Sequence, residues 1–395
     1  MRRGGASIAA LLLLLGAVIT TSVITTATTA PTRGGGGAVA PFVWDIPAPF
    51  PRPPVPHDNP MSSHTVELGR HLFYDTRLSG NGRQSCATCH RQELAFTDGR
   101  ARAVGSTGMM HPRGSMSLAN IGYAPALTWA DPRVTALEEQ ALVPMFGTSP
   151  VELGLDPDGA SLLQRVRADD VYQRLFAQAF PADSAPFSVT NIVRALGAFE
   201  RTLVSMRSPY DRYRYGRDRN AISESAKRGE MIFFSGQRGG CFQCHGGWNF
   251  SGAVRYDGDT TVSAGFFNTG LYNVAGAVSY PSSNTGLHAI TGRIEDVGRF
   301  RAPTLRNIAV TAPYMHDGSI ATLEAVVDHY AAGGRTIASG PQAGVGRDNR
   351  YKSPSVHGFV LTGTDRQDLV AFLEALTDSV FLRNPAFANP WPHEP

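Results

Sequence analysis

The sequence of 395 residues predicts a mainly α-helical fold with extended loops, built from two related halves. Apolar residues recur at helical spacing, most clearly between residues 189 and 204 and between residues 365 and 376. The 42 glycines and 27 prolines indicate long loops between the helices. The pattern Cys-x-x-Cys-His occurs twice, at residues 86–90 and 241–245, and it lies inside a longer repeat.

The repeated Cys-x-x-Cys-His pattern is a c-type haem attachment site. Its two thiols lie one helical turn apart and can form thioether bonds to one haem, and the histidine then becomes the proximal iron ligand. The two sites use all four cysteines of the chain, which argues against disulfides or unrelated thiol pairs. The predicted haem-binding residues are Cys86, Cys89 and His90 for the first haem, and Cys241, Cys244 and His245 for the second.

The repeat extends on both sides of the haem sites. The segment LGRHLFY at residues 68–74 precedes the first site as KRGEMIFF at residues 227–234 precedes the second. Downstream, Leu-Ala-Asn-Ile at residues 118–121 matches Leu-Arg-Asn-Ile at residues 305–308. Each half is therefore predicted to be one cytochrome-c-like haem domain.

The N-terminal segment predicts export to the periplasm, where c-type haem can be attached. Residues 1–30 have a basic start, an apolar run and small residues at the end, which is the pattern of a signal peptide, with an uncleaved anchor as the alternative. Residues 31–60 are rich in Gly and Pro and predict an extended arm. The N-terminal haem domain is then assigned to residues 61–204 and the C-terminal haem domain to residues 205–395. No other apolar run is long enough to span a membrane, and the net charge of +3 gives no indication of nucleic-acid binding.

The repeat also predicts what occupies the sixth position of each iron. Pro144 lies seven residues after Leu137, and Tyr330 lies seven residues after Leu323, at the same place of the two repeats. Proline cannot bind iron, so the first haem should be open to a small ligand, whereas a tyrosine phenolate can ligate the second iron. A packed core tyrosine is the alternative for Tyr330. The rival ligands are Tyr314, Met315 and His316.

An open haem that cleaves peroxide needs a group that moves a proton between the two oxygens. Glu152, close in sequence to Pro144, is the best candidate, and Gln140, one helical turn before Pro144, could orient the bound oxygen. His111 on a glycine-containing loop is a further candidate. A solvated carboxylate is the alternative for Glu152.

These motifs resemble the bacterial di-haem cytochrome c peroxidases and their MauG-like relatives over about residues 60–380. The likeness rests on residues 68–73, on both haem sites, on residues 137–140 leading to Pro144, and on residues 302–318. It implies a calcium ion between the domains, bound by the Asn120 side chain and the Thr311 and Pro313 carbonyls. It also implies that Trp129 lies between the haems. One departure is that the loop from Pro144 to Glu152 is two residues longer than usual in the family.

Within this family the chain resembles the MauG-like members, because Tyr330 stands where the peroxidases carry methionine. The resemblance is greatest to the MbnH-type enzymes, through residues 58–61, 105–108 and 115–118. It implies an enzyme that uses hydrogen peroxide through a bis-Fe(IV) state to oxidise an aromatic side chain of a secreted or periplasmic partner protein, with tryptophan converted to kynurenine in the MbnH branch. One alternative is a cytochrome c peroxidase that receives electrons from a small redox protein. A second is a di-haem electron carrier, which needs no open iron.

Overall fold

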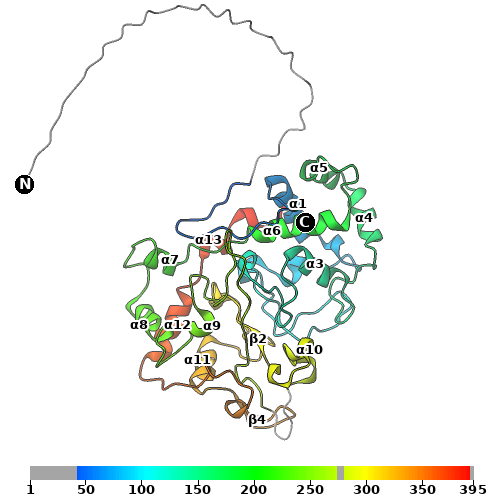
Figure 1. The fold of residues 1–395 in the computed structure, drawn as a ribbon. Helices are drawn as coiled ribbons and strands as arrows, with labels where there is room; N and C mark the ends of the chain where they lie inside the picture. Colours follow the sequence, from blue (N-terminus) through cyan, green and yellow to red (C-terminus); the bar gives the residue numbers. More distant parts are fainter. Residues whose placement is uncertain (1–41, 274–279, 392–395) are drawn as a thin grey trace, which may run out of the picture. The chain divides into compact units, whose positions relative to one another are not determined.

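Helices carry most of the regular structure in residues 42–273 and 280–391, which the computed structural model describes (Figure 1). The predicted mainly α-helical fold is confirmed. The predicted signal peptide, residues 1–30, and residues 31–41 of the predicted arm lie outside the described residues. Within the described part of the chain, no helix is both long and apolar enough to span a bilayer.

The helices, in chain order, are α1 (Ser63–Tyr74), α2 (Cys86–Cys89), α3 (Leu137–Phe146), α4 (Ala160–Arg167), α5 (Asp170–Ala179), α6 (Val189–Arg201), α7 (Pro209–Arg214), α8 (Glu224–Phe233), α9 (Phe242–His245), α10 (His288–Thr291), α11 (Leu323–Ala331), α12 (Asp365–Glu374) and α13 (Ser379–Leu382). The strands are short. β1 (Phe266–Phe267) pairs antiparallel with β2 (Phe300–Arg301), and β3 (Thr336–Ile337) pairs antiparallel with β4 (Gly344–Val345).

Two equivalent helix pairs form the framework: α1 packs on α6, and α8 packs on α12 (Figure 1). Each pair approaches closely at a glycine. A Cβ atom on Gly69 of α1 would overlap the carbonyl oxygen of Ala195 in α6, and one on Gly229 of α8 would overlap the carbonyl oxygen of Asp368 in α12. Both glycines come from the repeated segments that precede the haem sites, so the repeat in the sequence becomes the same helix crossing twice.

Each helix pair has its own hydrophobic core, and the cores repeat as well. In the first, the Phe73 ring lies 5.2 Å from that of Phe199 and 5.9 Å from that of Phe96. In the second, the Phe233 ring lies 5.1 Å from that of Phe372 and 6.0 Å from that of Phe250. The same triad of aromatic rings, from three matching segments, therefore holds each half together.

The C-terminal segment returns to the first core. Phe381 in α13 packs 5.7 Å from Phe96, and Phe387 and Trp391 also contact the first core. Residues 378–391 therefore pack with the N-terminal half, although they follow the second half in sequence. This segment has no counterpart in the repeat, so nothing in the sequence indicated where it would lie.

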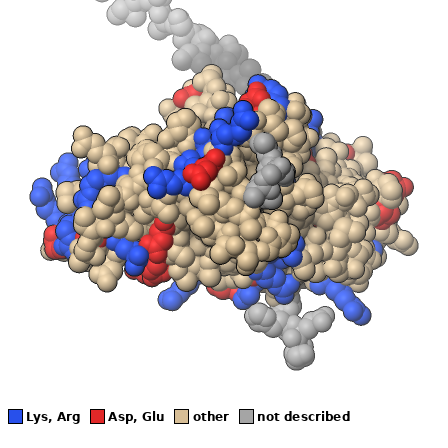
Figure 2. All heavy atoms as spheres, turned by 90° about the horizontal axis from the view of Figure 1, so that it is seen from below, with Lys and Arg blue, Asp and Glu red and all other residues tan. Residues whose placement is uncertain are grey.

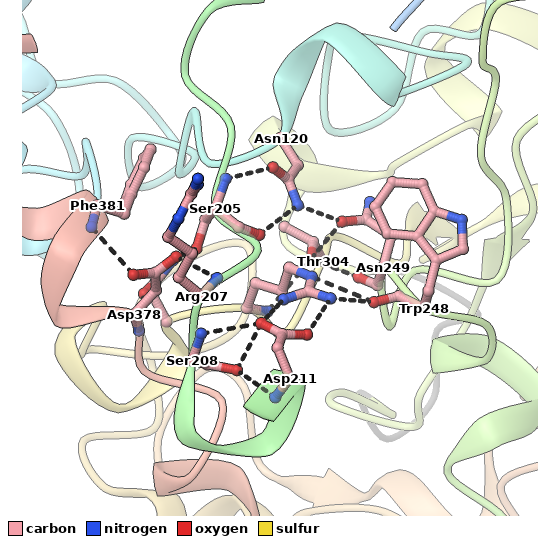
Figure 3. Close-up of polar contacts among 12 residues, drawn as sticks. Asn120, Ser205, Arg207, Ser208, Asp211, Trp248, Asn249, Thr304, Asp378 and Phe381 are labelled. Atoms are coloured by element: carbon pink, nitrogen blue, oxygen red, sulfur yellow. Dashed lines mark hydrogen bonds and ion pairs between the residues drawn. The ribbon is translucent and has the colours of Figure 1, made fainter. Parts of the chain in front are cut away.

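Two asparagines at matching positions of the repeat, Asn120 and Asn307, join the two halves, and Figure 3 shows the contact of Asn120 with Ser205. Asn120 and Asn307 occupy matching positions with left-handed φ values of 56° and 62°. The Asn120 Oδ1 atom accepts the Ser205 N–H at 2.7 Å, and the Asn307 Oδ1 atom accepts the Asp378 N–H at 2.7 Å. Asn307 also donates to the Ser205 hydroxyl at 2.9 Å. The chain is thus fixed just after α6 and just after α12.

The close contact between α8 and α12 can be tested by adding one methyl group at Gly229. Gly229→Ala should lower the melting temperature of the haem-loaded protein by several degrees, because overpacking of this kind costs about 1–3 kcal/mol. Thermal unfolding followed by circular dichroism measures the change. The matched control is Gly236→Ala, since a Cβ atom there meets nothing within 4 Å. Equal melting temperatures for the two variants would contradict the close crossing.

Candidate haem sites

The first candidate haem site is a cavity with about 770 Å³ of empty space, including its mouth open to solvent. It brings together residues that the sequence analysis predicted from separate segments. The predicted residues that line it are Cys86, Cys89, His90, His111, Gln140, Pro144 and Glu152. The peroxide-handling residues and the haem-binding residues therefore face one space.

His90 is oriented as a proximal ligand requires. Its Nδ1–H donates to the Phe96 carbonyl at 2.7 Å, and Phe96 has a left-handed φ of 63° that turns this carbonyl toward the ring. Nε2 is then the nitrogen left to bind iron. Burial lowers the pKa of His90, which keeps the imidazole neutral, as ligation needs.

Glu152 and His111 lie next to each other at this cavity. The His111 Nε2 atom is 4.0 Å from Glu152 Oε1, and the Glu152 side chain is 36 % exposed. Burial raises the pKa of Glu152 and lowers that of His111, so both groups are shifted toward their neutral forms. A carboxyl and an imidazole at this separation can exchange a proton through one water molecule. His111, the lesser candidate in the sequence analysis, is therefore as well placed as Glu152.

Glu200 is a cavity residue that the sequence analysis did not find. It lies in α6 and lines the first cavity with only 7 % of its surface exposed. Its Oε2 atom is buried and has no hydrogen-bond partner among the described residues. Burial raises the pKa of Glu200 to about 8, opposed by Arg201, so the carboxyl is protonated at neutral pH. The sequence does contain a signal that could have found Glu200. It follows Leu196 by four residues and so lies on the apolar, buried face of α6, where a carboxylate is unexpected.

The second candidate site is a larger cavity of about 1800 Å³, including space open to solvent. The residues of the second haem motif line it together with all four candidates for the sixth iron position and Trp129. These are Cys241, Cys244, His245, Trp129, Tyr314, Met315, His316 and Tyr330.

His245 repeats the arrangement of His90. Its Nδ1 atom lies 3.1 Å from the Phe250 carbonyl and 3.1 Å from the Pro303 carbonyl, and Phe250 has a left-handed φ of 52°. Burial lowers the pKa of His245 as well. Both predicted proximal histidines are therefore held by backbone carbonyls through Nδ1.

The loop after His245 is fixed by a buried ion pair (Figure 3). Arg306 donates to both carboxylate oxygens of Asp211 in α7, at 2.8 and 3.0 Å, and to the Trp248 carbonyl at 2.6 Å. The Arg306 side chain has no exposed surface, and that of Asp211 is 4 % exposed. Arg306 also lines the second cavity, so this ion pair connects α7, the haem-binding loop and the cavity wall.

The two helices that carry Pro144 and Tyr330 begin at equivalent residues. α3 begins at Leu137 and α11 at Leu323, so the register expected from the repeat is the register of the helices. Pro144 lines the first cavity and Tyr330 the second.

The rival ligands differ in how they are engaged. The Tyr314 hydroxyl donates to the Ile308 carbonyl at 3.2 Å, and the His316 ring stacks on Phe300 at 3.7 Å. Met315 packs against the second core. The Tyr330 hydroxyl has no hydrogen-bond partner among residues 42–273 and 280–391, and burial raises its pKa.

Trp129 belongs to the first half of the sequence but lines the second cavity, where its Nε1–H donates to the Gly114 carbonyl at 2.9 Å. Residues 97–100 and 114–117, which follow the first haem motif, line the same cavity. The wall of the second site is thus built partly from the first half of the chain.

The predicted calcium ligands are not gathered in one cavity. Asn120 lines a small cavity with Asn249, while Thr311 and Pro313 line the neighbouring second haem cavity. The Asn120 Oδ1 atom already accepts the Ser205 N–H, as described above. No cluster of three or more His, Cys, Asp or Glu side chains able to hold a metal occurs in the described part of the chain. The calcium ion stays a prediction.

Both cavities fit a c-type haem by their donor sets. Each has two thiols on one helical turn, and a neutral histidine whose Nδ1 is engaged by a carbonyl, leaving Nε2 to bind iron. Cys86, Cys89, His90, Cys241, Cys244 and His245 would hold the two haems, which supply oxidation chemistry that the side chains alone do not have.

The buried acid Glu200 has a pH-dependent consequence for stability. Its folded-state pKa of about 8 lies above that of an unfolded glutamate, so the folded protein binds more protons between these values. The free energy of unfolding should therefore fall as pH rises through this window, by at most about 1.4 kcal/mol per pH unit. Glu200→Gln, measured by thermal unfolding at pH 6 to 9, should flatten this dependence.

The matched control for this test is Glu139→Gln, since Glu139 is an exposed glutamate of α3. It should follow the wild-type pH dependence. If Glu200→Gln also followed the wild type, Glu200 would not be a buried acid in the folded protein.

Comparisons with known proteins agree with these sites. The sequence profile of the family described as di-haem cytochrome c peroxidase matches residues 63–219. The chain is 36% identical over 348 residues to cytochrome-c peroxidase IdrP1 of Pseudomonas sp. (strain SCT), covering 84% of this chain and 86% of that protein. It is 36% identical over 333 residues to methylamine utilization protein MauG of Methylorubrum extorquens, covering 83% of each.

Among solved structures, a MauG-like protein associated with microbial copper homeostasis is 47% identical, with a TM-score of 0.86 over 89% of this chain and 100% of that one. The likeness extends over most of the chain and includes both haem motifs. The chain therefore belongs to the family of di-haem cytochrome c peroxidases and MauG proteins, and it is a haem oxidoreductase.

Proposed function

We propose that the chain is an exported oxidase with two cytochrome-c-like haem domains, which uses hydrogen peroxide to oxidise an aromatic side chain of a partner protein. Tryptophan is the first candidate for that side chain, with kynurenine as its product. The observation that carries the proposal is the difference between two equivalent helix positions. Pro144 lines the first cavity and Tyr330 the second, at the same register of α3 and α11.

The contacts of Tyr330 support its assignment as the outer ligand of the second iron. Its hydroxyl is free of hydrogen bonds among the described residues, whereas the hydroxyl of the rival Tyr314 is engaged by the Ile308 carbonyl. Proline at the equivalent position of the first site leaves room for peroxide. One iron open and one closed is the arrangement that separates reaction with peroxide from storage of oxidising equivalents.

The two haems, which the cysteines and histidines of the two motifs would hold, would supply the reaction with peroxide and the storage of its two oxidising equivalents. The side chains of the first cavity manage the proton that peroxide cleavage requires. In this proposal Glu152 moves it between the peroxide oxygens, with His111 beside it, and Gln140 orients the bound oxygen. Trp129, in the wall of the second cavity, couples the two sites.

The identity to the MauG-like protein associated with microbial copper homeostasis, 47%, favours oxidation of a partner protein. The 36% identity to cytochrome-c peroxidase IdrP1 supports a second candidate function, removal of peroxide with electrons from a small redox protein. The proline at the first site argues against the third candidate, a di-haem electron carrier, because such a carrier needs no open position.

Replacing the proposed outer ligand tests the first function. The resting ferric protein should give one high-spin and one low-spin signal in electron paramagnetic resonance. Tyr330→Phe should abolish the low-spin signal while both haems stay covalently attached, because only the oxygen ligand is lost. Mass spectrometry checks the haem content. The control Tyr314→Phe removes a neighbouring hydroxyl of the same cavity and should keep the low-spin signal. If Tyr314→Phe lost the low-spin signal and Tyr330→Phe kept it, Tyr314 would be the ligand, and an ordinary peroxidase would be favoured.

The role of Glu152 predicts a kinetic effect without loss of haem. Glu152→Gln should slow the reaction with peroxide by about 100-fold, because a positioned acid–base group typically contributes at least that factor. Stopped-flow absorption of the haem bands measures the rate. Glu139→Gln, a matched change on the exposed side of α3, should react like the wild type. An undiminished rate in Glu152→Gln would transfer the role to His111.

A further inference from the structure

The end of α7 and the loop that follows it are strongly basic. Arg212, Arg214, Arg217 and Arg219 are all exposed, and none of them forms an ion pair within residues 42–273 and 280–391. With Asp218 included, residues 212–219 have a net charge of +3, equal to that of the whole chain. The adjacent Asp211 cannot offset this charge because it is buried in its ion pair with Arg306.

Other exposed basic side chains nearby are neutralised. In α8, Arg228 pairs with Asp368 at 2.7 Å, and in α12, Arg366 pairs with Asp328 at 2.7 Å. Figure 2 shows one face of the molecule, on which basic and acidic side chains are interspersed among uncharged residues. Residues 212–219, which we call the arginine loop, therefore carry four arginines without carboxylate partners in the described part of the chain, whereas these arginines of α8 and α12 are paired.

Aromatic rings connect this loop to the wall of the second cavity. Tyr215, in the middle of the arginine loop, is 37 % exposed, and its ring lies 4.9 Å from that of Phe50. The Phe50 ring lies 5.6 Å from that of Trp248. The guanidinium of Arg306, which lines the second cavity, lies 5.5 Å from the Phe50 ring and 5.9 Å from the Trp248 ring. The exposed Tyr215 is thus connected to Arg306 in the cavity wall through the rings of Phe50 and Trp248.

We propose that the arginine loop is the docking surface for an acidic partner protein, with Tyr215 and Trp248 carrying electrons from that partner to the second haem. The proposal rests on the proposed function and deepens it by naming the surface and the charge of the partner. Arginines bind carboxylates in bidentate geometry, and tyrosine and arginine are the side chains that contribute most at protein interfaces. Unpaired charges at the surface also raise the rate of association with an oppositely charged protein.

Tyr215 loses one electron to the oxidised second haem through Trp248, and its phenolic proton passes to solvent water. One electron from the partner's aromatic side chain, with a proton from water, restores Tyr215. Two such transfers oxidise that side chain by two electrons, and hydrogen peroxide supplies both oxidising equivalents.

Docking is tested on the resting haem-loaded protein with a synthetic glutamate-rich peptide that contains one tryptophan and a fluorescent label. Fluorescence anisotropy should show binding that weakens with salt, and a lysine-rich peptide of the same length should not bind. The double variant Arg214→Glu, Arg219→Glu should weaken binding of the acidic peptide at least about tenfold, because attraction becomes repulsion at two positions.

The control for docking is Arg174→Glu, which makes the same substitution once, at an exposed arginine of α5 in the first half. It should change the affinity less than about twofold. If the acidic peptide did not bind at low salt, or if the control weakened binding as much as the double variant, the docking surface would be wrong.

The electron route is tested by mass spectrometry of the same peptide after addition of peroxide. Tyr215→Phe should slow oxygen addition to the peptide tryptophan at unchanged affinity, since the ring contacts stay and the oxidisable phenol is lost. Tyr213→Phe is the control, because the Tyr213 ring contacts Lys227 and Tyr210 instead of Phe50. If Tyr215→Phe and Tyr213→Phe added oxygen to the peptide tryptophan at the same rate, the electron route through Tyr215 would be wrong. Failure of the wild type to oxidise a bound peptide would count against the proposed function, while the anisotropy measurements would still decide on the docking surface.

Discussion

The second half of the molecule depends on the buried ion pair between Arg306 and Asp211. Two buried charges are costly unless their polar atoms are paired, and here the guanidinium donates to both carboxylate oxygens and to the Trp248 carbonyl. Loss of either partner would leave a buried charge uncompensated, at a cost of about 3–5 kcal/mol. Because Trp248 lies three residues after His245, the ion pair also determines where the proximal histidine loop can lie. The main contribution of the ion pair is therefore to position, because it fixes α7 relative to the haem-binding loop.

The two halves share their construction and differ in a few side chains. The close glycine crossing, the triad of phenylalanines and the carbonyl that engages the proximal histidine occur in both halves with nearly equal distances. The difference is concentrated at the cavity walls, where Pro144 corresponds to Tyr330 and where the first cavity alone has Glu152, His111 and Glu200. A shared frame with different walls is how one fold can give two haems different reactivity.

The sequence predicted the parts of this fold that repeat. The helix starts at Leu137 and Leu323 followed from one half compared with the other, and so did the cavity positions of Pro144 and Tyr330. The return of Phe381 to the first core was not predictable, because a tertiary contact of an unrepeated segment leaves no periodic trace. The match of Asn120 with Asn307 in the repeat was visible, but the contacts of their side chains were not. Both use their side-chain oxygen to hold the chain after a helix, and the calcium ion that the resemblance implies at Asn120 stays a prediction.

The proposed arrangement separates the two ends of the reaction in space. Peroxide needs a small cavity with proton-transferring side chains, which the first site has in Glu152 and His111. A partner protein needs an open surface with charge and aromatic rings, which α7 and the arginine loop offer beside the second site. A single haem would have to react with peroxide and also accept electrons from the partner protein, so its peroxide cavity would be exposed to that partner. With two haems, only electrons pass between the sites, so the first cavity can stay narrow while the surface that meets the partner can be broad.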